Sequence, residues 1–430
     1  MKETKFKQTL VQTKEGSRHC EERSDVAIQS GFKMTEVGMI PNNWEIKPLK
    51  DIAGLKAGKM TSYNDFNPKY PCFGGNGIRA YLSHYSHDGI YPIIGRQGEL
   101  CGNVNLAKGK FYATEHAVVA SPKKDIDAIW LYYQLTALNL NQYATGCAQP
   151  GLSVEKINDV YTQVPPTIKE QQRIANALSD VDSLINNLEK LIAKKKNIKQ
   201  GAMQQLLTGK KRLPGFAPAK PTYKQTELGK IPTDWEFEVF GKLVSIYRGG
   251  SPRPIEAYIT TNPSGINWIK IGDVEEGAKY ITSTQERIIP EGKSKSREVH
   301  KGDFILSNSM SFGRPYILKV DGCIHDGWLT IQDYQDTFDT DFLYYMLSSE
   351  VVFNQYVSMA AGSSVQNLNK EKVAAVKLFY PPSKTEQSAI ANVFSDMDTE
   401  IATLETKLAK YRKLKTGMMQ QLLTGKIRLV

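Results

Sequence analysis

Two stretches of the chain carry apolar residues at alternating steps of three and four, the spacing of a helix with one narrow apolar face. This a/d pattern predicts a coiled-coil seam. The seam positions are Ile174, Leu178, Val181, Ile185, Leu188 and Ile192 in the first stretch, and Ile390, Phe394, Met397, Ile401, Leu404 and Leu408 in the second. An ordinary core helix is the alternative, but a narrow stripe that occurs twice favours two helices that pair with each other.

The limits of both predicted helices are marked by proline and glycine. Each helix follows a Pro-Pro pair, at 165–166 and at 381–382, and each precedes a glycine, Gly209 or Gly425. Proline is favoured at helix starts and glycine just beyond helix ends. About 40 residues, each rising about 1.5 Å, would form a rod of roughly 60 Å.

The helical stretches belong to an internal repeat. Residues 170–213 align without gaps on residues 386–429, with 25 identities in 44 positions. Within them, the run Met-Gln-Gln-Leu-Leu-Thr-Gly-Lys occurs at 203–210 and again at 419–426. Such a repeat indicates two copies of one unit, a globular domain followed by a long helix.

A second repeated block marks the start of each globular domain. It reads Gly-x-Ile-Pro-x-x-Trp-Glu and occurs at 38–45 and 229–236. Near the N-terminus, residues 6–9 resemble residues 223–226, so we interpret residues 10–33 as a segment without a counterpart in the second copy. Between the repeated blocks the two copies diverge strongly. A similar frame with dissimilar middles suits two domains with one fold and two different ligands.

Short β-rich runs and turn signals in the middles predict α+β globular domains. Strands are expected at 266–272, 302–307 and 109–113, and helices at Ile129–Leu140 and Asp341–Ser358. The predicted organisation is an N-terminal extension (1–34), a first globular domain (35–166), a central long helix (167–213), a linker (214–225), a second globular domain (226–382) and a C-terminal long helix (383–430).

The chain is basic, and most of the excess charge lies in the two helical stretches. It has 55 Lys and Arg against 45 Asp and Glu, a formal net charge of +10. Basic proteins favour polyanions, chiefly nucleic acid or anionic membrane. Residues 167–213 and 383–430 hold nine of the ten excess charges. The globular domains would therefore need local placement of charge to bind DNA.

The order of charges along the helices predicts their relative direction. Acids such as Asp180, Asp182 and Asp398 come early, whereas the lysines at 194–196 and 407–415 come late. Antiparallel packing sets acidic halves against basic halves, and parallel packing sets like charges together. We therefore predict two pseudo-symmetric globular domains separated by an antiparallel two-helix coiled coil, with the chain termini on the same side.

Glycine-flanked turns in the globular domains carry candidate DNA-binding side chains. They lie at 73–79 and 95–98 in the first domain, and we take 248–253 and 307–314 as their counterparts in the second. Arg can bond guanine bidentately, and Gln or Asn can bond adenine. A solvated turn residue is an equal alternative for each one, but as a set in both copies they favour binding. The candidates are Lys59, Arg79, Arg96, Gln97, Arg248, Arg253, Lys270, Asn308, Ser309 and Arg314.

No metal, cofactor or catalytic site is predicted. The five cysteines are scattered without a CxxC pair, and His84-x-x-His87 has no third ligand at a recognisable spacing. The glycine-rich run at 73–77 precedes no strand–loop–helix unit with a downstream acid, and Thr-Gly-Lys at 208–210 lacks the upstream glycine of a P-loop. A secretion signal and a membrane-length apolar run are also missing, which predicts a cytoplasmic protein.

The Gln-Gln-Leu-Leu-Thr-Gly-Lys helix end, the Pro-Pro/Glu-Gln helix start and the Gly-x-Ile-Pro-x-x-Trp-Glu domain start resemble specificity subunits of type I restriction–modification enzymes. The resemblance runs from about Thr35 to Val430. It implies that each globular domain is a target-recognition domain for one half of a bipartite double-stranded DNA site. The helices would set the spacer and dock two modification subunits.

The same resemblance implies that restriction subunits join the complex, and that S-adenosylmethionine, ATP and Mg are bound by partner subunits only. The chain itself would then be a non-catalytic recognition subunit. A stand-alone DNA methyltransferase or nuclease is the first alternative, and a purely structural coiled-coil adaptor is the second.

Overall fold

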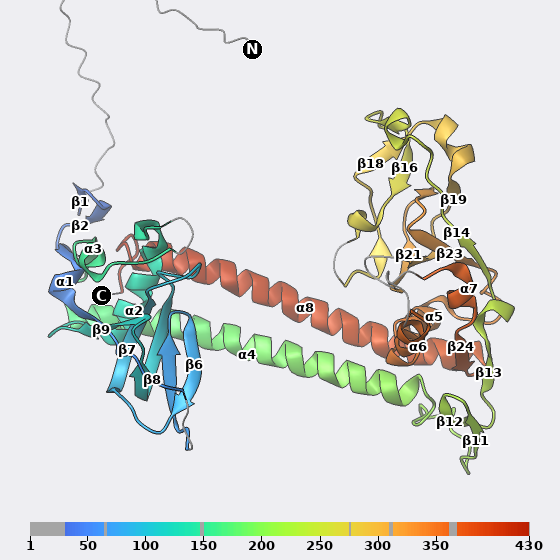
Figure 1. Cartoon of the computed structure of the whole chain (residues 1–430), viewed down its shortest axis with the longest axis horizontal. Helices are drawn as coiled ribbons and strands as arrows, with labels where there is room; N and C mark the ends of the chain where they lie inside the picture. The colour runs from blue at the N-terminus through green and yellow to red at the C-terminus, as the bar shows by residue number, and fades with distance from the viewer. Residues whose placement is uncertain are drawn as a thin grey trace, which may run out of the picture. The chain divides into compact units, whose positions relative to one another are not determined.

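The computed structural model describes residues 31–63, 67–146, 150–274, 277–308, 313–360 and 368–429 (Figure 1). Contacts divide the chain into two compact units, residues 1–184 with 411–430, and residues 185–410. Each unit holds one globular domain, the first part of the long helix that follows it, and the last part of the other long helix. Within these described ranges, no helix is long and apolar enough to cross a membrane.

The first domain is built around a six-stranded sheet with the order β4-β9-β7-β8-β5-β6. Its elements are β1 (Phe32–Thr35), β2 (Gly38–Pro41), β3 (Glu45–Pro48), α1 (Leu49–Ile52), β4 (Ala53–Ala57), β5 (Tyr70–Gly74), β6 (Gly77–Leu82), β7 (His87–Gly95), β8 (Val104–Ala113), β9 (Ala117–Pro122), α2 (Ala128–Ala137), η1 (Leu140–Tyr143), α3 (Val154–Asn158) and β10 (Tyr161–Val164). Helix α2 packs on β7, β8 and β9, and its Trp130, Leu131 and Leu135 are fully buried.

The second domain has two five-stranded sheets, β14-β23-β20-β21-β17 and β15-β18-β16-β22-β19. Its strands are β11 (Tyr223–Thr226), β12 (Gly229–Pro232), β13 (Glu236–Val239), β14 (Ser245–Arg248), β15 (Ile259–Thr260), β16 (Ile266–Ile269), β17 (Tyr280–Ile281), β18 (Glu286–Ile288), β19 (Arg297–Val299), β20 (Phe304–Ser307), β21 (Pro315–Leu318), β22 (Gly322–Ile324), β23 (Trp328–Gln332) and β24 (Lys377–Tyr380). Its helices are η2 (Phe240–Lys242), η3 (Ile255–Ala257), η4 (Ile271–Asp273), η5 (Pro290–Lys295), α5 (Thr340–Leu347), α6 (Glu350–Ala360) and α7 (Lys370–Ala374).

One sheet is common to both domains although their sequences diverge. If the five strands of each sheet are numbered along the chain, both sheets have the same order in space. The two orders are β4-β9-β7-β8-β5 and β14-β23-β20-β21-β17. In both sheets the neighbours pair antiparallel, apart from a parallel pair at the end, β8 with β5 and β21 with β17. The second domain inserts its additional sheet between strands of this shared sheet. These features confirm the predicted pair of α+β domains.

Two predicted domain helices differ from the observed ones. The first, expected at 129–140, ends at Ala137 as α2 and is followed by the short helix η1. The second, expected as one helix over 341–358, is broken into α5 and α6. The break falls at two serines, Ser348 and Ser349, and the hydroxyl of Ser348 bonds the backbone of Tyr344. Serine competes with the helix for backbone hydrogen bonds, which favours an interruption there.

The two long helices are α4 (Ile168–Leu206) and α8 (Lys384–Leu422), each 39 residues and so about 58 Å long. The hydroxyls of Thr167 and Ser383 each accept a bond from the backbone N–H three residues further on, at 3.2 and 3.4 Å. These are N-caps. Beyond the other ends, Gly209 and Gly425 adopt positive φ angles of 67° and 71°. The helix starts and ends predicted from proline and glycine are therefore confirmed.

The ends of the long helices are part of the domain cores. In the first unit, the buried cluster around Trp44 includes Ile174 and Leu178 of α4, and Leu422 and Leu423 at the end of α8. In the second unit, the cluster around Trp235 takes in the residues Leu206, Leu207, Ile390 and Phe394. The later seam positions Ile185, Leu188, Ile192, Ile401 and Leu408 are buried, whereas Val181, Met397 and Leu404 are half-buried. The first seam residues of each helix therefore pack in the core of a globular domain, as in an ordinary core helix.

Ion pairs within each unit confirm the antiparallel direction of the helices. The pairs of the second unit are Lys195–Glu400, Lys196–Glu405 and Lys199–Asp398, at 2.6, 2.7 and 2.5 Å. They join the late part of α4 to the early part of α8. In the first unit, Lys415 near the end of α8 lies 2.6 Å from Asp182 in the early part of α4. Basic halves therefore meet acidic halves, as the order of charges predicts.

In the second unit, a buried ion pair joins the segment after α4 to the start of α8. Arg212, beyond the end of α4, donates two hydrogen bonds to Glu386 in the first turn of α8, and only 9% and 3% of these side chains are exposed. The guanidinium also bonds Asp234 and lies 5.6 Å from the ring centre of Trp235. Burial raises the pKa of the Glu386 carboxyl, and hydrogen bonding and attraction to Arg212 oppose that rise. The pair joins two helix ends to the start of the domain.

The first unit has an equivalent ion pair, in which the arginine follows α8 and the glutamate lies at the start of α4. Arg428, six residues beyond α8, donates two hydrogen bonds to Glu170 in the first turn of α4. Its guanidinium also bonds Asn43 at 2.9 Å and lies 5.6 Å from the ring centre of Trp44. The end of the chain is thereby fixed to the start of the first domain. We call each such set, an Arg–Glu pair over a tryptophan, a junction.

Each domain also reaches both helices through a buried tyrosine. The hydroxyl donates to an aspartate on the long helix that follows its own domain, at 2.7 and 2.8 Å, and that aspartate pairs with a lysine of the other helix. The two sets are Tyr133–Asp182–Lys415 and Tyr345–Asp398–Lys199. Burial raises the pKa of both tyrosines, which therefore stay protonated and able to donate.

The start of the first domain corrects one sequence interpretation. Strand β11 (Tyr223–Thr226) forms a hairpin with β12, and its counterpart is β1 (Phe32–Thr35), which pairs in the same register with β2. Residues 32–33, which the sequence comparison places in a segment without a counterpart, therefore have one. The earlier run at 6–9, which resembles β11 in sequence, lies outside the described residues.

Replacing Arg428 with alanine should destabilise the first unit. Glu170, whose side chain is 4% exposed, would lose its cationic partner. Removing one member of a buried ion pair typically costs about 3–5 kcal/mol. Because 24% of the Arg428 side chain is exposed, we expect about 3 kcal/mol. Hydrogen exchange of residues 40–48 and 168–178, followed during chemical denaturation, measures this loss.

The matched control is Lys426→Ala, which removes an exposed cation from the same segment. It should leave the exchange of both regions unchanged. Equal protection in the Arg428→Ala protein and the parent chain would contradict a stabilising junction.

Candidate nucleic-acid interface

Segments from four parts of the first domain meet at one end of its sheet. The N–H of Lys59, just after β4, donates to a carbonyl at the end of β8 at 3.0 Å. The N–H of Arg96, after β7, donates to the carbonyl of His116, between β8 and β9, at 2.9 Å. Gly75, in the β5–β6 turn, packs so closely that a Cβ there would lie 3.2 Å from the Gln97 carbonyl. A rigid sheet thus presents several loops together, as binding sites commonly require.

Three of the predicted residues of the first domain are gathered at this end of the sheet. Lys59 and Gln97 are exposed, and Arg96 is half-buried. The fourth, Arg79, lies on the edge strand β6. Its side chain packs over Gly74 beside the β5–β6 turn, and its guanidinium is 5.9 Å from the ring centre of Tyr63. This end therefore presents two cations and an amide, the groups that contact phosphates and base edges.

The histidine pair of the first domain packs against aromatic rings. His87 stacks on Phe111 with ring centres 5.1 Å apart, and His84 meets Tyr112 edge-on at 5.0 Å. Burial lowers the pKa of His87. In the part of the chain that the structure describes, no group of three His, Cys, Asp or Glu is placed to hold a metal ion.

In the second domain, Asp326 joins several predicted residues at the corresponding end of the sheet. Its carboxylate lies 3.5 Å from Nη2 of Arg253, and its backbone carbonyl accepts a bond from Nε of Arg248 at 3.1 Å. The same carbonyl accepts a bond from the amide of Asn308 at 2.9 Å. The hydroxyl of Ser251 donates to the Asp326 carboxylate at 2.9 Å. We call these five residues the Asp326 cluster.

Within this cluster the predicted residues have different surroundings. Asn308 is only 3% exposed, and its side chain holds the turn of Asp326 in place. The side chains of Arg248 and Arg253 are 60% and 82% exposed and can reach a ligand. Lys270 forms an ion pair with Glu286 at 2.5 Å. The predicted Ser309 lies outside the described residues.

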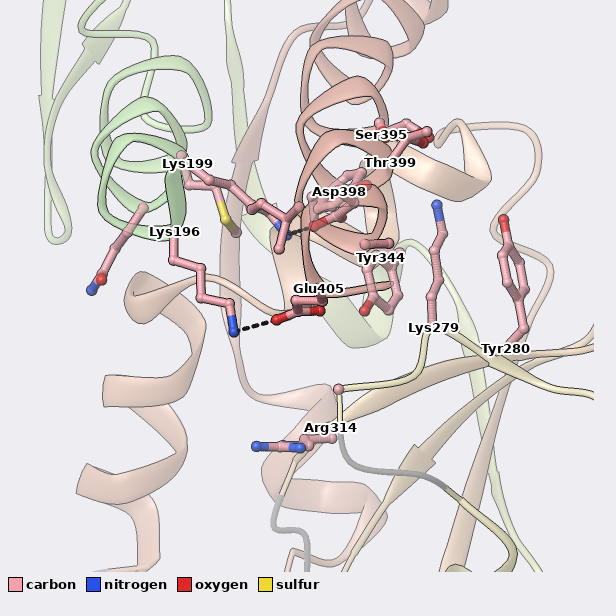
Figure 2. A pocket seen from close by; sticks show the side chains of 16 residues that line it. Lys196, Lys199, Lys279, Tyr280, Arg314, Tyr344, Ser395, Asp398, Thr399 and Glu405 are labelled. Carbon is pink, nitrogen blue, oxygen red and sulfur yellow. Dashed lines mark hydrogen bonds and ion pairs between the residues drawn. The ribbon is translucent and has the colours of Figure 1, made fainter. Parts of the chain in front are cut away.

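Arg314 lines a different part of the second unit. A cavity of about 960 Å³ lies between α4, α8 and the domain, and Figure 2 shows Arg314 at its border. Lys279, between Tyr344 and Tyr280 in the same view, forms a 2.7 Å ion pair with Asp341. The ion pairs of Lys196 and Lys199 with α8 also border this space. Burial raises the pKa of Tyr344 to about 12.

A glycine at equivalent positions draws the loops together in both domains. A Cβ on Gly58, just after β4, would lie 2.1 Å from a carbonyl oxygen at the end of β8. A Cβ on Gly249, just after β14, would lie 2.1 Å from the carbonyl oxygen of His325. Neither position can accept a side chain unless the backbone moves. The recurrence shows that this end of the shared sheet is built in the same way twice.

One predicted correspondence between the loops is wrong. Residues 248–253 follow β14, so their counterpart is the segment after β4 that contains Lys59. The segment 73–79 instead spans the β5–β6 turn. The other correspondence agrees with the structure, because 95–98 follows β7 and 307–314 joins the equivalent strand β20 to β21. Glycine spacing alone does not fix which loops correspond, because the correspondence depends on strand order.

The sequence pattern does not single out Asp326 or Ser251 as site residues. The available signal was weak, a His-Asp-Gly run just before the buried Trp328. An acid in a turn is usually a solvated residue or an Asx-turn former, so its type and position alone do not single it out. Its role depends on contacts with residues about 75 positions earlier in the chain.

Gly249→Ala should distort the Asp326 cluster, whereas Gly250→Ala should not. A methyl group at Gly249 would clash with backbone, and forced overpacking typically costs about 1–3 kcal/mol. At Gly250 the nearest atom would be 3.4 Å away, which is ordinary contact. Thermal unfolding and hydrogen exchange of residues 324–328 measure the difference. Equal behaviour of the two variants would contradict the close approach.

Comparison with known proteins agrees with this architecture. A family model described as the type I restriction modification DNA specificity domain matches residues 41–200 and 232–411. The EcoprrI specificity subunit of Escherichia coli is 49% identical over 148 residues, which cover 33% of this chain and 37% of that protein. The putative MjaX specificity subunit of Methanocaldococcus jannaschii is 27% identical over 430 residues, covering 93% of this chain and 97% of that protein.

Solved structures show the same fold. The S subunit of a type I restriction–modification system from M. genitalium has a TM-score of 0.60 at 16% identity, covering 88% of this chain and 96% of that one. A chain from another type I restriction–modification system has a TM-score of 0.56 at 14% identity, covering 90% and 99%. Because the family model matches most of the chain in two successive copies, the chain belongs to the family of type I restriction–modification specificity subunits.

Proposed function

We propose that this chain is the non-catalytic DNA-reading subunit of a type I restriction–modification complex, and that it recognises a bipartite double-stranded target. The observation that carries the proposal is the recurrence of one five-stranded order in both domains, with different side chains on the loops at the same end. One scaffold with two loop sets suits the reading of two different half-sites.

The chemistry of the two loop ends supports contact with DNA. The first domain offers Lys59, Arg96 and Gln97, and the second offers Arg248 and Arg253. Arginine and lysine neutralise phosphates, and arginine and glutamine also form paired hydrogen bonds with base edges in the major groove. The general excess of positive charge on the chain would add attraction that does not depend on sequence.

The long helices would have two tasks in the complex. As a rigid antiparallel pair they would set the spacer between the half-sites, and they would dock two modification subunits. The same run of residues at both helix ends offers one kind of surface twice, which suits two copies of one partner. Restriction subunits would join this assembly in the cytoplasm. S-adenosylmethionine, ATP and Mg would be bound by the partner subunits.

Domain exchange tests the proposal. The chain would be expressed with its modification and restriction subunits, and the methylated motif in the host DNA would be mapped. Replacing residues 236–380 with the corresponding segment of another specificity subunit should change one half of the motif and leave the other half and the spacer unchanged. The matched exchange of residues 45–164 should change the opposite half.

Two results would contradict the proposal. One is an exchange that alters both halves of the motif, or neither, in a complex that still methylates DNA. The other is methyl transfer or DNA cleavage by the purified chain alone, which would assign the chemistry to this subunit.

A further inference from the structure

Asp326 is held rigidly in the second domain. The hydroxyl of Ser251 donates to its carboxylate at 2.9 Å and lies 3.3 Å from its backbone N–H, which donates in return. The backbone carbonyl of Asp326 accepts bonds from Arg248 and from the buried amide of Asn308. Carboxylate and backbone are therefore both fixed. A side chain that binds this carboxylate meets a partner of defined position.

Two exposed arginines share this carboxylate. Nη2 of Arg253 lies 3.5 Å and Nη2 of Arg248 lies 3.9 Å from the same oxygen of Asp326. Arg248 is further restrained by the bond from its Nε to the Asp326 carbonyl. Arg253 has no such second bond among the contacts of the described residues, and its side chain is 82% exposed. Arg253 therefore contacts the carboxylate with one edge of its guanidinium, and most of its side chain is exposed.

The carboxylate of Asp326 offsets part of the positive charge of the two arginines, which weakens the attraction for a phosphate relative to that for an uncharged base edge. Burial tends to raise the pKa of Asp326, but the hydrogen bond from Ser251 and other contacts lower it below its usual value. Burial lowers the pKa of the neighbouring His325, which favours the neutral ring. An anionic phosphate at Arg253 would meet an ionised carboxylate 3.5 Å from the guanidinium. A base edge would not suffer this repulsion.

Guanine presents the matching acceptors. Its O6 and N7 accept two parallel bonds from one guanidinium, the commonest specific contact in protein–DNA complexes. Arg253 also lines an open cavity of about 570 Å³ together with Trp268, Lys270 and His325, so its free edge faces space. An arginine that is already oriented loses less side-chain freedom on binding.

We infer that Arg253 reads a guanine in the half-site of the second domain, and that Asp326 is the positioning residue that orients it. This inference rests on the proposed function, because it assumes that the second domain reads one half-site. It adds a base and a residue pair to that function. Asp326 acts through Arg253 and need not touch the DNA.

The test uses the complete chain with its modification subunits and duplexes that carry the mapped target. Each guanine of the second-domain half-site is replaced in turn by 7-deazaguanine, which lacks the N7 acceptor. At one position this change should weaken binding by the parent complex roughly 10-fold, and it should not weaken binding by the Arg253→Ala complex further. The same variant should lose roughly 10- to 100-fold of its preference for G·C over A·T there.

Lys301→Ala is the charge control, because it removes an exposed cation from the same domain. It should keep the full preference for guanine. The inference is overturned if Arg253→Ala weakens all sequences equally and reduces the salt dependence by about one phosphate contact, since that is the behaviour of a phosphate ligand. It is also overturned if the mapped half-site contains no G·C pair.

The positioning role of Asp326 is tested separately, through the preference for guanine in an Asp326→Asn variant. Asp326→Asn should reduce the preference for guanine at the same position without lowering the melting temperature of the domain. In the Arg253→Ala background it should have no further effect on that preference, because the two residues act as one unit. A loss that adds fully to that of Arg253→Ala would assign Asp326 a separate role.

These outcomes separate the inference from the proposed function. If the complex shows no sequence-specific binding at all, the proposed function fails. If it binds a bipartite target and responds to domain exchange, but not to guanine substitution, the function stands and the Arg253 assignment fails.

Discussion

The structure depends on one interaction that is made twice, the buried bond between an arginine beyond one long helix and a glutamate in the first turn of the other. Arg212 bonds Glu386 in the second unit, and Arg428 bonds Glu170 in the first. Each guanidinium also lies over the tryptophan that begins the domain. The desolvated carboxylate requires its cation, so the contact is specific as well as stabilising. It fixes which helix end meets which domain, and in the first unit it fixes the end of the chain to the beginning of the domain.

The junctions contain the segments that are alike in the two copies of the repeat, and they leave out the segments that differ. The helix end, the helix start and the domain start fold together at the junctions, where a Cβ on Gly209 or Gly425 would collide with the proline of the domain-start motif. Lys59, Arg253 and the other described residues at the loop end of the shared sheet lie outside these junctions and can differ between the domains. The first domain therefore presents Lys59, Arg96 and Gln97, and the second presents arginines around Asp326. One frame thus carries two different sets of loop side chains.

The long-range frame could be predicted from the sequence, because it rests on periodicity, charge order and duplicated motifs. The helix limits, the antiparallel direction and the α+β class follow from such signals. The sites were less accessible. Asp326 gathers its partners from segments about 75 residues earlier, and no local pattern reports contacts of that range. The loop correspondence failed for a similar reason, since it depends on strand order. The break in the predicted helix at 341–358 shows serine side chains prevailing over apolar periodicity.

The most direct test of the account is zero-length cross-linking of the intact chain with a carbodiimide, which joins amines to carboxylates that are already in contact, followed by peptide mapping. The account predicts links between the late part of α4 and the early part of α8, at Lys195–Glu400, Lys196–Glu405 and Lys199–Asp398, together with Lys415–Asp182. Links that join the early part of one helix to a cation in the early part of the other would contradict antiparallel pairing, and with it the basis for two equivalent junctions.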